Sequence, residues 1–447
     1  MEKKRRAFLK KLGLATAAVS VSPMVFAKEL KTVNILKRLS KPKNDKVIKL
    51  ALIGAGGMGT ADTETALLHA NIELVAVCDL YSGRLEKAKE KWGSNLFVTN
   101  DYKKLISRND IDAVIIGTPD HWHKQISIDA LKAGKHVYCE KPMVHSVAQG
   151  LKVINAWKSS GKIFMVGSQG LSSLGNEKAK ELLASGAIGE LNYAEGFWAR
   201  NSPEGAWQYK IPEDASLKTV DWKRYVANTT DRPFDAMRFF RWRNYLDYGT
   251  GMSGDLFVHL FSSLHFITNS LGPNKVSAMG GLRYWKDGRE VPDVLLGMFD
   301  YPKNERHPAF NLSLRCNFVD GTSGSTYLKI VGSKGSMDVK WEEVVLKRNE
   351  NVDHQDPFLS AKAKENNLRN ERKKILEPKE TIYKVQEGYK GAHYDHFANF
   401  FNAIRTQGSV VEDPIFGFRA AAPALLCNDS YHQNKFINWD PENMKIV

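Results

Sequence analysis

Cysteine is scarce in this chain. Of 447 residues only four are cysteines, and none forms a CxxC pair or another metal-type spacing: Cys78, Cys139, Cys316 and Cys427. This scarcity excludes a disulfide-rich scaffold and the usual cysteine-based zinc sites. We therefore expect no bound metal, and we expect the cysteines within apolar runs to be buried free thiols.

Long hydrophobic runs and Pro/Ser-rich linkers are also missing. After the first 27 residues no stretch resembles a membrane-spanning helix. Apolar residues make up 43% of the chain, which is ordinary for a globular protein, and the length suits two domains. Because no linker separates two halves, we expect the two domains to be interleaved.

Acidic residues are outnumbered, with 50 Asp and Glu against 64 Lys and Arg, and the formal net charge is +14. Residues 1–27 supply +5 of that charge. A second basic cluster lies within residues 360–375 and comprises Lys362, Lys364, Arg369, Arg372, Lys373 and Lys374. No aromatic residue is interleaved with it, so nucleic acid is not an expected partner, and its role stays open.

The first 27 residues have the order of a twin-arginine signal peptide. Arg5 and Arg6 stand in the motif Lys-Arg-Arg-Ala-Phe-Leu-Lys, a modest apolar stretch follows, and Ala27 ends a small-residue cleavage site. The apolar stretch is too short and too polar for a permanent membrane span. We expect the folded protein to be exported to the periplasm. The alternative is a cytoplasmic chain with a basic tail.

Residues 46–168 alternate between strand-like and helix-like segments. Strands are expected at Val47–Gly54, Ile72–Asp79, Ala113–Thr118, His136–Cys139 and Ile163–Gly167. Helices are expected at Gly59–Leu68, Gly83–Trp92, His123–Ala133 and Val147–Lys158. This alternation predicts right-handed βαβ units and an α/β domain of the Rossmann type, with a parallel sheet.

The rhythm changes in residues 169–447. An apolar helix at Gly251–Thr268 precedes strands with period-two alternation at Lys275–Tyr284, Val294–Tyr301, Phe310–Phe318, Gly324–Val331 and Ser336–Val339. Such strands predict an α+β domain with a large, mostly antiparallel sheet, suited to substrate binding and to a homodimer or tetramer formed through the sheet. Two final helices, His393–Thr406 and Ile415–Gln433, are expected to return to the first domain.

A glycine-rich turn stands between the first strand and the first helix, with the sequence Gly54-Ala55-Gly56-Gly57-Met58-Gly59. In a dinucleotide-binding turn the glycines permit a tight bend, a close approach to a pyrophosphate, and close helix–strand packing. Asp79, which ends the next strand, would accept a hydrogen bond from a ribose 2′-hydroxyl and repel a 2′-phosphate. This favours NAD, while the nearby Arg84 leaves NADP open.

Two further loops follow strand ends, where parallel sheets bind their ligands. The residues of these loops that we expect along the nicotinamide half of the cofactor are Thr118, Pro119, His121, His123, Glu140 and Lys141. His123 could equally cap the start of a helix.

With these motifs the chain resembles the Gfo/Idh/MocA family, which includes glucose–fructose oxidoreductase and myo-inositol dehydrogenase. The resemblance runs from Lys49 to Gln169 and from Trp222 to His265, and returns weakly at Asn438-Trp439-Asp440-Pro441. The spellings Thr-Pro-Asp-His-Trp-His and Val-Tyr-Cys-Glu-Lys-Pro are similar to those of exported bacterial members. The resemblance implies that Lys141 lies between nicotinamide and substrate, as a catalytic or orienting group, with Pro142 holding its backbone.

Asp255 and His259 are four residues apart on an expected helix, so both can point at one ligand. Alone, a histidine on an apolar helix is more often a core residue, as we expect for His265. The same spacing in the resembled family implies that His259 is the acid/base and that Asp255 contacts substrate and tunes it. A lysine near His259 would favour the neutral imidazole, which can accept a proton near pH 7.

Residues 198–248 contain eleven aromatic side chains, about twice the chain average of 10%. Sugar rings present apolar C–H faces and many hydroxyls, so aromatic platforms with fixed donors suit them. Most single aromatics of this segment fill a core or a subunit contact, yet as a group they indicate a pocket. We expect Trp122, Arg241 and Tyr248 to line it, and we expect a sugar or glycoside as substrate.

Three functions are compatible with these motifs. The favoured one is an NAD(P)-dependent sugar or glycoside dehydrogenase, with His259 as base and with Lys141 and Asp255 assisting. The second is a redox-neutral glycosidase that oxidises C3, eliminates the aglycone, adds water and reduces the sugar again. Export favours it, because free NAD is scarce outside the cytoplasm, and implies a tightly bound cofactor. The third, a non-catalytic dinucleotide sensor, is disfavoured by the retained site residues.

Overall fold

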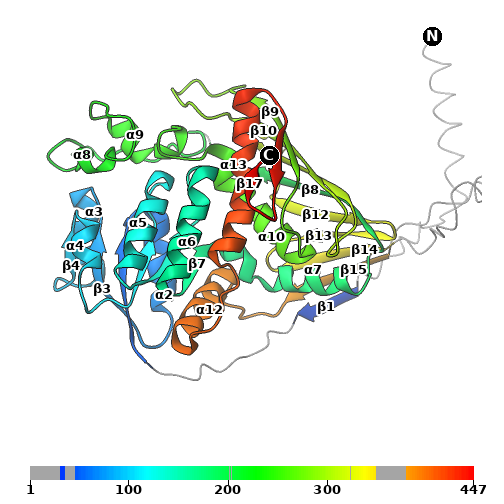
Figure 1. The fold of residues 1–447 in the computed structure, drawn as a ribbon, viewed down its shortest axis with the longest axis horizontal. Coiled ribbons are helices and arrows are strands. Elements are labelled where there is room, and N and C mark those ends of the chain that lie inside the picture. Colours follow the sequence, from blue (N-terminus) through cyan, green and yellow to red (C-terminus); the bar gives the residue numbers. More distant parts are fainter. Residues whose placement is uncertain (1–30, 36–45, 201, 203, 323, 349–378) are drawn as a thin grey trace, which may run out of the picture. The chain divides into compact units, whose positions relative to one another are not determined.

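The computed structural model describes residues 31–35, 46–200, 202, 204–322, 324–348 and 379–447 (Figure 1). The expected signal peptide at residues 1–27 and the basic cluster at residues 362–374 lie outside these ranges. Two sheets organise the described residues, one of six strands and one of eleven.

The six-stranded sheet is parallel throughout, as its continuous apolar strands predict. Its order is β4-β3-β2-β5-β6-β7, so the direction of strand addition reverses between β2 and β5. The strands are β2 (Ile48–Ile53), β3 (Ile72–Cys78), β4 (Phe97–Thr99), β5 (Ala113–Ile116), β6 (His136–Glu140) and β7 (Phe164–Gly167). The reversal creates the crevice in which doubly wound sheets bind ligands.

Helices connect these strands, and the predicted βαβ alternation is confirmed. They are α2 (Gly57–Leu67), α3 (Ser82–Trp92), α4 (Tyr102–Ile106), α5 (Asp120–Lys132) and α6 (Gly150–Ser160). Strand β4 and helix α4 were not expected, because they are too short to show a periodic pattern. It also started α5 too late: Pro119 is the N-cap, so His121 and His123 lie inside the helix rather than in a loop.

The eleven-stranded sheet has the order β1-β15-β14-β13-β12-β8-β11-β10-β9-β16-β17. Its strands are β1 (Lys31–Ile35), β8 (Leu191–Ala199), β9 (Lys275–Gly281), β10 (Val294–Tyr301), β11 (Phe310–Asn317), β12 (Tyr327–Gly332), β13 (Gly335–Val339), β14 (Glu343–Arg348), β15 (Lys379–Val385), β16 (Ile437–Asp440) and β17 (Lys445–Ile446). Of the pairs with a defined register in this sheet, β8 with β11 is parallel and the others are antiparallel. The expected large, mostly antiparallel sheet is therefore confirmed.

Helices of the second domain pack on the large sheet, on one another and on the first domain. They are α7 (Leu174–Ala184), α10 (Val258–Thr268), α12 (Ala392–Thr406) and α13 (Pro414–Gln433). The last two pack against the first domain, α12 on α2 and α13 on α6 and β7 (Figure 1). Phe397, Phe400 and Phe401 of α12 are buried in the hydrophobic core of the first domain. The domains therefore share packed surfaces.

Residues 204–250 are mostly irregular and carry two short α-helices, α8 (Trp222–Tyr225) and α9 (Ala236–Phe240), and a 3-10 helix at Trp242–Asn244. A β-bridge joins Tyr81, just after β3, to Val220, and the Asp221 amide donates to the Leu80 carbonyl at 2.8 Å. Figure 1 shows α8 and α9 at the upper left, above α3 and α4. The aromatic segment thus lies over the carboxyl ends of the parallel strands.

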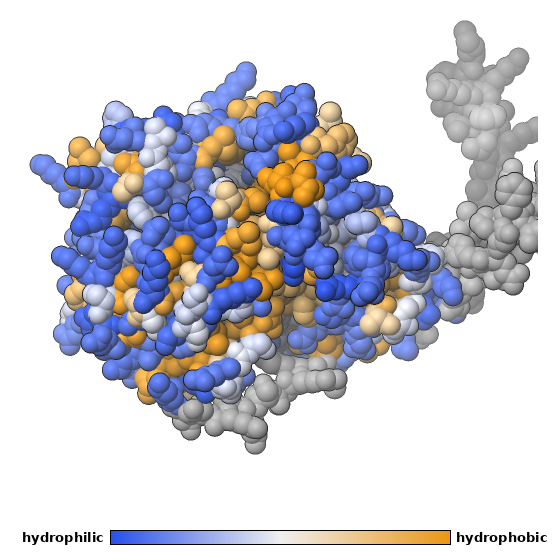
Figure 2. Space-filling view, viewed as in Figure 1, coloured by the Kyte–Doolittle hydropathy of each residue, from blue (hydrophilic) through white to orange (hydrophobic). Residues whose placement is uncertain are grey.

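The surface is mixed in character. On the face drawn in Figure 2 hydrophilic side chains dominate, and hydrophobic ones form a band around α13 and the C-terminal strands. No helix among the described residues is long and apolar enough to cross a membrane. All four cysteines are buried and unpaired, which confirms the expectation of free thiols.

Candidate active site

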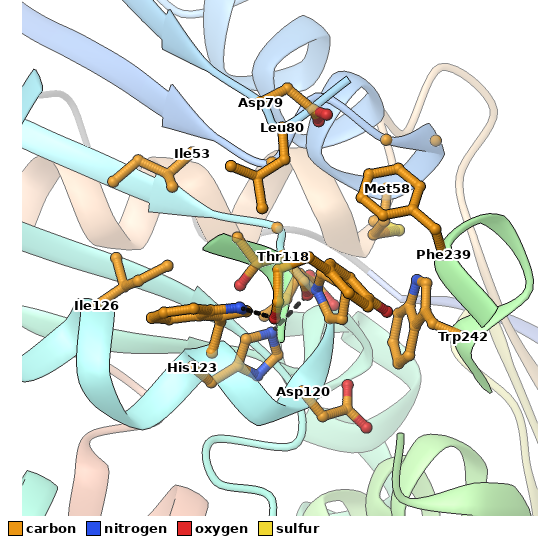
Figure 3. Close-up of a pocket in the computed structure, with 18 of the residues that line it drawn as sticks. Ile53, Met58, Asp79, Leu80, Thr118, Asp120, His123, Ile126, Phe239 and Trp242 are labelled. Atoms are coloured by element: carbon orange, nitrogen blue, oxygen red, sulfur yellow. Dashed lines mark hydrogen bonds between the residues drawn. The ribbon is translucent and has the colours of Figure 1, made fainter. Parts of the chain in front are cut away.

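A cavity of about 980 Å³ lies between the aromatic segment and the carboxyl ends of the parallel strands. This volume is at the upper end of the usual range for small-molecule sites. Figure 3 shows the part nearest the first domain, with Met58, Asp79, Thr118 and His123 facing Phe239 and Trp242 of the aromatic segment. The opposite part is lined by Lys141, Arg200, Trp207, Tyr209, Lys210, Arg243, Asp255 and His259.

The glycine turn brings the start of α2 to this cavity. Gly54 has a φ of +95°, and a Cβ placed on Gly59 would lie 2.1 Å from the Gly54 carbonyl oxygen. Both positions therefore require glycine, one for its backbone conformation and one for close packing. A Cβ on Gly57 would instead meet nothing within 4 Å, which leaves the first turn of α2 open.

This turn fits a dinucleotide cofactor. The first amides of α2 have no helical acceptors and carry the partial positive charge of the helix N-terminus, which suits a pyrophosphate. Gly54, Gly56, Gly57 and Met58 all line the cavity, as does Asp79. Gly59 does not, and its contribution is the close contact with Gly54.

Asp79 is held in place by the backbone around it. Its carboxylate accepts from the amides of Ala55 at 2.8 Å and Tyr81 at 2.9 Å. The guanidinium of Arg84 lies 3.5 Å away and also faces the rings of Phe239 and Phe240. Arg84 is therefore engaged by Asp79 in this state.

His123 ties together the two loops at the nicotinamide side. Its ring nitrogens lie 2.7 Å from the Pro142 carbonyl oxygen and 2.9 Å from the Thr118 carbonyl oxygen, so both act as donors. Burial opposes a charge on the ring, but Cys139, Asp120 and the Pro142 carbonyl raise the pKa of His123 to about 10. We assign His123 to positioning Lys141 through the adjacent Pro142. It does not cap a helix start, because the N-cap of α5 is Pro119.

His121 does not line the cavity, which corrects the expected cofactor contact. Its ring nitrogens face the carbonyl oxygens of Tyr225 at 3.1 Å and Tyr248 at 3.3 Å. Burial lowers the pKa of His121 to about 3. It anchors the aromatic segment on α5, because α5 turns this side chain away from the crevice.

Lys141 and Asp255 meet on the opposite wall. The Lys141 ammonium donates to the Asp255 backbone carbonyl at 2.7 Å and to its carboxylate at 3.0 Å. Arg243 Nε donates to the same carboxylate oxygen at 3.2 Å. Burial would raise the pKa of Asp255, but Lys141 and Arg243 together hold it well below its ordinary value. Asp255 is thus an ionised clamp that fixes the Lys141 ammonium.

His259 lines the same part of the cavity and is neutral. Burial is the main cause that holds its pKa well below 6.5, and Lys141 and Arg200 add to it, while Asp255 opposes them. The His259 ring stacks on Trp198, with centroids 5.3 Å apart. A neutral imidazole at a cavity wall can accept a proton near neutral pH.

The segment that carries Asp255 is not α-helical, contrary to expectation. Residues Ser253–Phe257 form a π-helix, and α10 begins only at Val258. A Cβ on Gly254 would lie 2.2 Å from the Thr250 side chain, so only glycine fits there. Single π turns are frequent at functional sites. The extra residue in the turn changes how Asp255 projects relative to His259, and Asp255 bonds to Lys141 and Arg243.

Of the three residues expected to line a sugar pocket, the cavity includes only Trp122. Arg241 instead donates to the Tyr209 carbonyl at 2.9 Å and so holds the irregular segment around Tyr209 in place. Tyr248 is fully buried, and its ring packs 4.9 Å from that of Tyr225. Cavity residues that the sequence analysis did not select include Arg200, Trp207, Tyr209, Lys210, Trp242 and Arg243. The aromatic and basic composition of this segment was the sequence signal for a pocket. Because the segment is irregular, no periodic pattern shows which of its side chains point into the cavity.

Buried acids lie behind Lys141. Glu140 accepts from Gln169 at 2.6 Å, and Asp62 bonds to His393 at 2.9 Å. Burial raises the pKa values of Glu140 and Asp62 to about 8; the Asp62 carboxyl adds to the rise at Glu140, whereas a hydrogen bond with Glu140 opposes the rise at Asp62. Glu140 therefore holds its proton at neutral pH and does not act as an anion in the cavity.

Comparison with known families agrees with this architecture. Residues 48–168 match the oxidoreductase family model with an NAD-binding Rossmann fold, and residues 180–438 match the C-terminal alpha/beta domain of the same family. A NAD-binding oxidoreductase is thus the class that fold and cavity define. The chain belongs to the Gfo/Idh/MocA family, which confirms the resemblance seen in the sequence.

Individual relatives include sugar-active enzymes. The chain is 29% identical over 238 residues to a glycosyl hydrolase family 109 protein of Shewanella baltica, across 49% of this chain and 50% of the relative. It is 32% identical over 188 residues to an inositol 2-dehydrogenase of Salmonella paratyphi B, across 40% and 55%. The chain thus spans about half the length of the curated relatives it matches. A levoglucosan dehydrogenase in complex with NADH and levoglucosan has the same fold, with a TM-score of 0.63, 18% identity, and coverage of 88% and 99%.

Proposed function

We propose that this protein oxidises a secondary alcohol of a sugar or glycoside with NAD as cofactor. The observation that carries the proposal is the fixed Lys141 ammonium beside neutral His259, in the cavity that also contains the glycine turn. The similarity to an inositol dehydrogenase supports a polyhydroxylated ring as substrate. Trp122 and Trp242 offer aromatic faces for such a ring.

Each wall residue has a chemical role in this proposal. A bound dinucleotide would supply the hydride acceptor, with its pyrophosphate at Gly54 and Met58, a ribose at Asp79 and its nicotinamide toward Lys141. His259 takes the hydroxyl proton of the substrate, because its lowered pKa leaves the imidazole free to accept it. Lys141 donates a hydrogen bond to the carbinol oxygen and stabilises the charge that develops there, while Asp255 keeps the ammonium in position.

We propose NAD over NADP. Asp79 lines the cavity with an oxygen-rich, negatively charged face, which disfavours a 2′-phosphate. The pairing of Arg84 with Asp79 supports this choice, because a guanidinium engaged by a carboxylate is less available to a phosphate.

A redox-neutral glycosidase is the second candidate, and the similarity to a family 109 glycosyl hydrolase favours it. In such a cycle the sugar is oxidised, loses its aglycone by elimination, adds water and is reduced again. The same His259 and Lys141 would serve both redox steps. The cofactor would stay bound throughout, which suits a protein expected to work outside the cytoplasm.

One experiment separates the two candidates. The protein is purified without added nucleotide, denatured, and assayed for released NAD(H), and the intact protein is then tested on a panel of glycosides for free aglycone and for NADH absorbance. Net NADH without aglycone supports the dehydrogenase. Aglycone without net NADH supports the glycosidase. Neither product from any glycoside or free sugar would count against both.

We also propose that the protein is a homo-oligomer formed through the large sheet. Met279, Leu296 and Met298 are 74%, 49% and 67% exposed, and Leu296 pairs with Met279 across β9 and β10. A cluster of exposed apolar side chains on one sheet face is typical of a subunit contact. Light scattering should give a multiple of the 50.3 kDa chain mass, less any removed leader, and Leu296→Glu should lower it.

Periplasmic location stays a proposal that rests on residues 1–27 alone. It agrees with a cofactor that is bound before export, since the twin-arginine route carries folded proteins.

A further inference from the structure

The substrate part of the cavity is rich in positive charge. Lys141, Arg200, Lys210 and Arg243 line it. The carboxylate they face is Asp255, since Glu140 holds its proton at neutral pH. Asp120, which also lines the cavity, accepts from the Thr250 amide and hydroxyl and faces the protonated ring of His123.

Two of these four cations are already paired and two are not. Lys141 and Arg243 bond to Asp255. Among the described residues, Arg200 and Lys210 have no carboxylate partner. The Arg200 guanidinium still acts on the active centre, because its charge contributes to the lowered pKa values of both Asp255 and His259.

Trp207 forms a fixed part of the same wall. It is 3% exposed, and its indole nitrogen is buried without an acceptor among the described residues. Its backbone has a φ of +64°, which a bulky residue rarely adopts and which costs on the order of 1–3 kcal/mol. Such strain is found where the fold must hold one side chain in place, and here the Trp207 ring packs 4.8 Å from that of Phe318 and lines the cavity.

We infer that the substrate is an acidic sugar, whose anionic oxygen group binds to Arg200 and Lys210. This inference rests on the proposed function and names its substrate class. Arg200 and Lys210 are exposed side chains at the cavity wall, and among the described residues neither has a carboxylate partner, so an anionic ligand would supply the missing counter-charge. The guanidinium fork matches a carboxylate in two parallel hydrogen bonds. A uronic acid or its glycoside meets this requirement, with its carbinol at His259.

An anionic ligand would also change the pKa of His259, the proposed base. Arg200 lowers the pKa of His259, so an anion bound to Arg200 offsets that effect and makes His259 a better proton acceptor. A neutral sugar leaves the positive charge around His259 uncompensated. Selectivity for acidic sugars should therefore appear in kcat as well as in KM.

The test compares matched substrates on the full-length protein with its bound cofactor. Glucuronic acid is set against glucose and galacturonic acid against galactose, as free sugars and as phenyl glycosides. We expect kcat/KM to favour the acid by about tenfold, because charge-assisted hydrogen bonds to exposed side chains are weakened by hydration. Glucose 6-sulfate and glucose 6-phosphate form separate arms. Much faster turnover of these esters than of uronates would mean that the bound anionic group is a sulfate or phosphate and not a carboxylate.

Two variants locate the effect. Arg200→Met and Lys210→Met each keep most of the side-chain length and remove one charge. Both should raise KM for the acidic sugar severalfold and lower the ratio of kcat/KM for the acidic sugar to that for its neutral partner. The matched control is Arg306→Met, an exposed arginine that does not line the cavity. Equal losses on acidic and neutral sugars in Arg200→Met would overturn the inference.

Binding without turnover keeps this inference separate from the proposed function. Calorimetric titration with glucuronic acid should show binding that weakens with added salt and is lost in Arg200→Met. If the acid binds but no sugar is oxidised or cleaved, the anion site stands and the proposed function fails. If neutral sugars are oxidised as well as acids, the proposed function stands and the acidic-sugar inference fails.

Discussion

His259 illustrates how burial and charge set the state of one residue. Its imidazole loses hydration inside the cavity and lies near the Lys141 and Arg200 cations, so the protonated form is disfavoured. The base form is therefore present at any pH above a pKa that lies well below 6.5. The nearby Asp255 carboxylate moderates this shift without reversing it.

Replacing His259 by alanine should remove the base and leave the fold intact. We expect the rate to fall on the order of a hundred- to ten-thousand-fold, while cofactor and sugar still bind. The wild type should lose activity only as pH falls well below 6.5, where His259 becomes protonated, and the variant should lack that acid limb. Rates measured from low to neutral pH check this. A near-normal rate with the same limb would leave Lys141 as the base.

Lys141 and Asp255 should respond differently to substitution, although they touch. Lys141→Met should lower both rate and sugar affinity, since the ammonium orients the carbinol and helps keep His259 neutral. Asp255→Asn should bind sugar nearly as well but shift the acid limb to lower pH, because it removes the carboxylate that raises the His259 pKa. Parallel kcat and KM profiles over pH distinguish them. An acid limb that moves up in Asp255→Asn would contradict this assignment.

Asp79 should decide the choice of cofactor. Asp79→Ala removes the carboxylate at the ribose side and frees Arg84 to meet a phosphate, so the affinity ratio of NAD to NADP should fall. Fluorescence titration with both reduced cofactors measures it, with Asp101→Ala, another acid that lines the cavity, as the control. An unchanged ratio would mean that Asp79 does not contact the ribose.

At the scale of elements, the π turn at Ser253–Phe257 sets the geometry of the clamp. Gly254→Ala places a Cβ 2.2 Å from the Thr250 side chain, which only a backbone shift can relieve. We expect a loss of stability of about 1–3 kcal/mol and a lower rate, with cofactor affinity retained. Denaturant unfolding and kinetics check this. Gly321→Ala, whose Cβ would meet nothing within 4 Å, is the control and should be near neutral.

Regular elements could be predicted because their periods are local. The parallel strands β2, β3, β5, β6 and β7 were all expected from apolar runs that end in turn residues. Strand β8 was not, although it pairs with β11 and β12 at the middle of the large sheet. Its sequence mixes small, polar and aromatic residues, and the neighbours that stabilise it are more than a hundred positions away.

At the scale of the whole molecule, the N-terminal arginine pair predicts where the protein works. With Arg5 and Arg6 both changed to lysine, the protein should remain in the cytoplasm, because the export receptor reads the guanidinium pair. Cell fractionation with immunoblotting measures this, and Lys3→Arg with Lys4→Arg is a charge-matched control that should still be exported. Undiminished periplasmic accumulation of the double-lysine variant would exclude the twin-arginine route.

The sequence by itself determined the features that depend on neighbouring residues. The glycine turn, the parallel α/β domain, and Lys141, Asp255 and His259 as cavity residues all follow from short motifs and from apolar periods. Family membership followed from the same motifs. Local sterics and hydrogen bonding fix such features, so a window of a few residues contains the information.

Only the tertiary structure decided which side chains of the aromatic segment face the cavity. Trp207 turns inward and Tyr248 is buried beneath His121, and no period in an irregular segment separates the two. The partly buried bond from His393 to Asp62 spans 331 positions, so it exists only once α12 packs on α2. Side-chain direction and burial in such places are set by long-range packing, and that packing also sets the pKa values on which the chemistry depends.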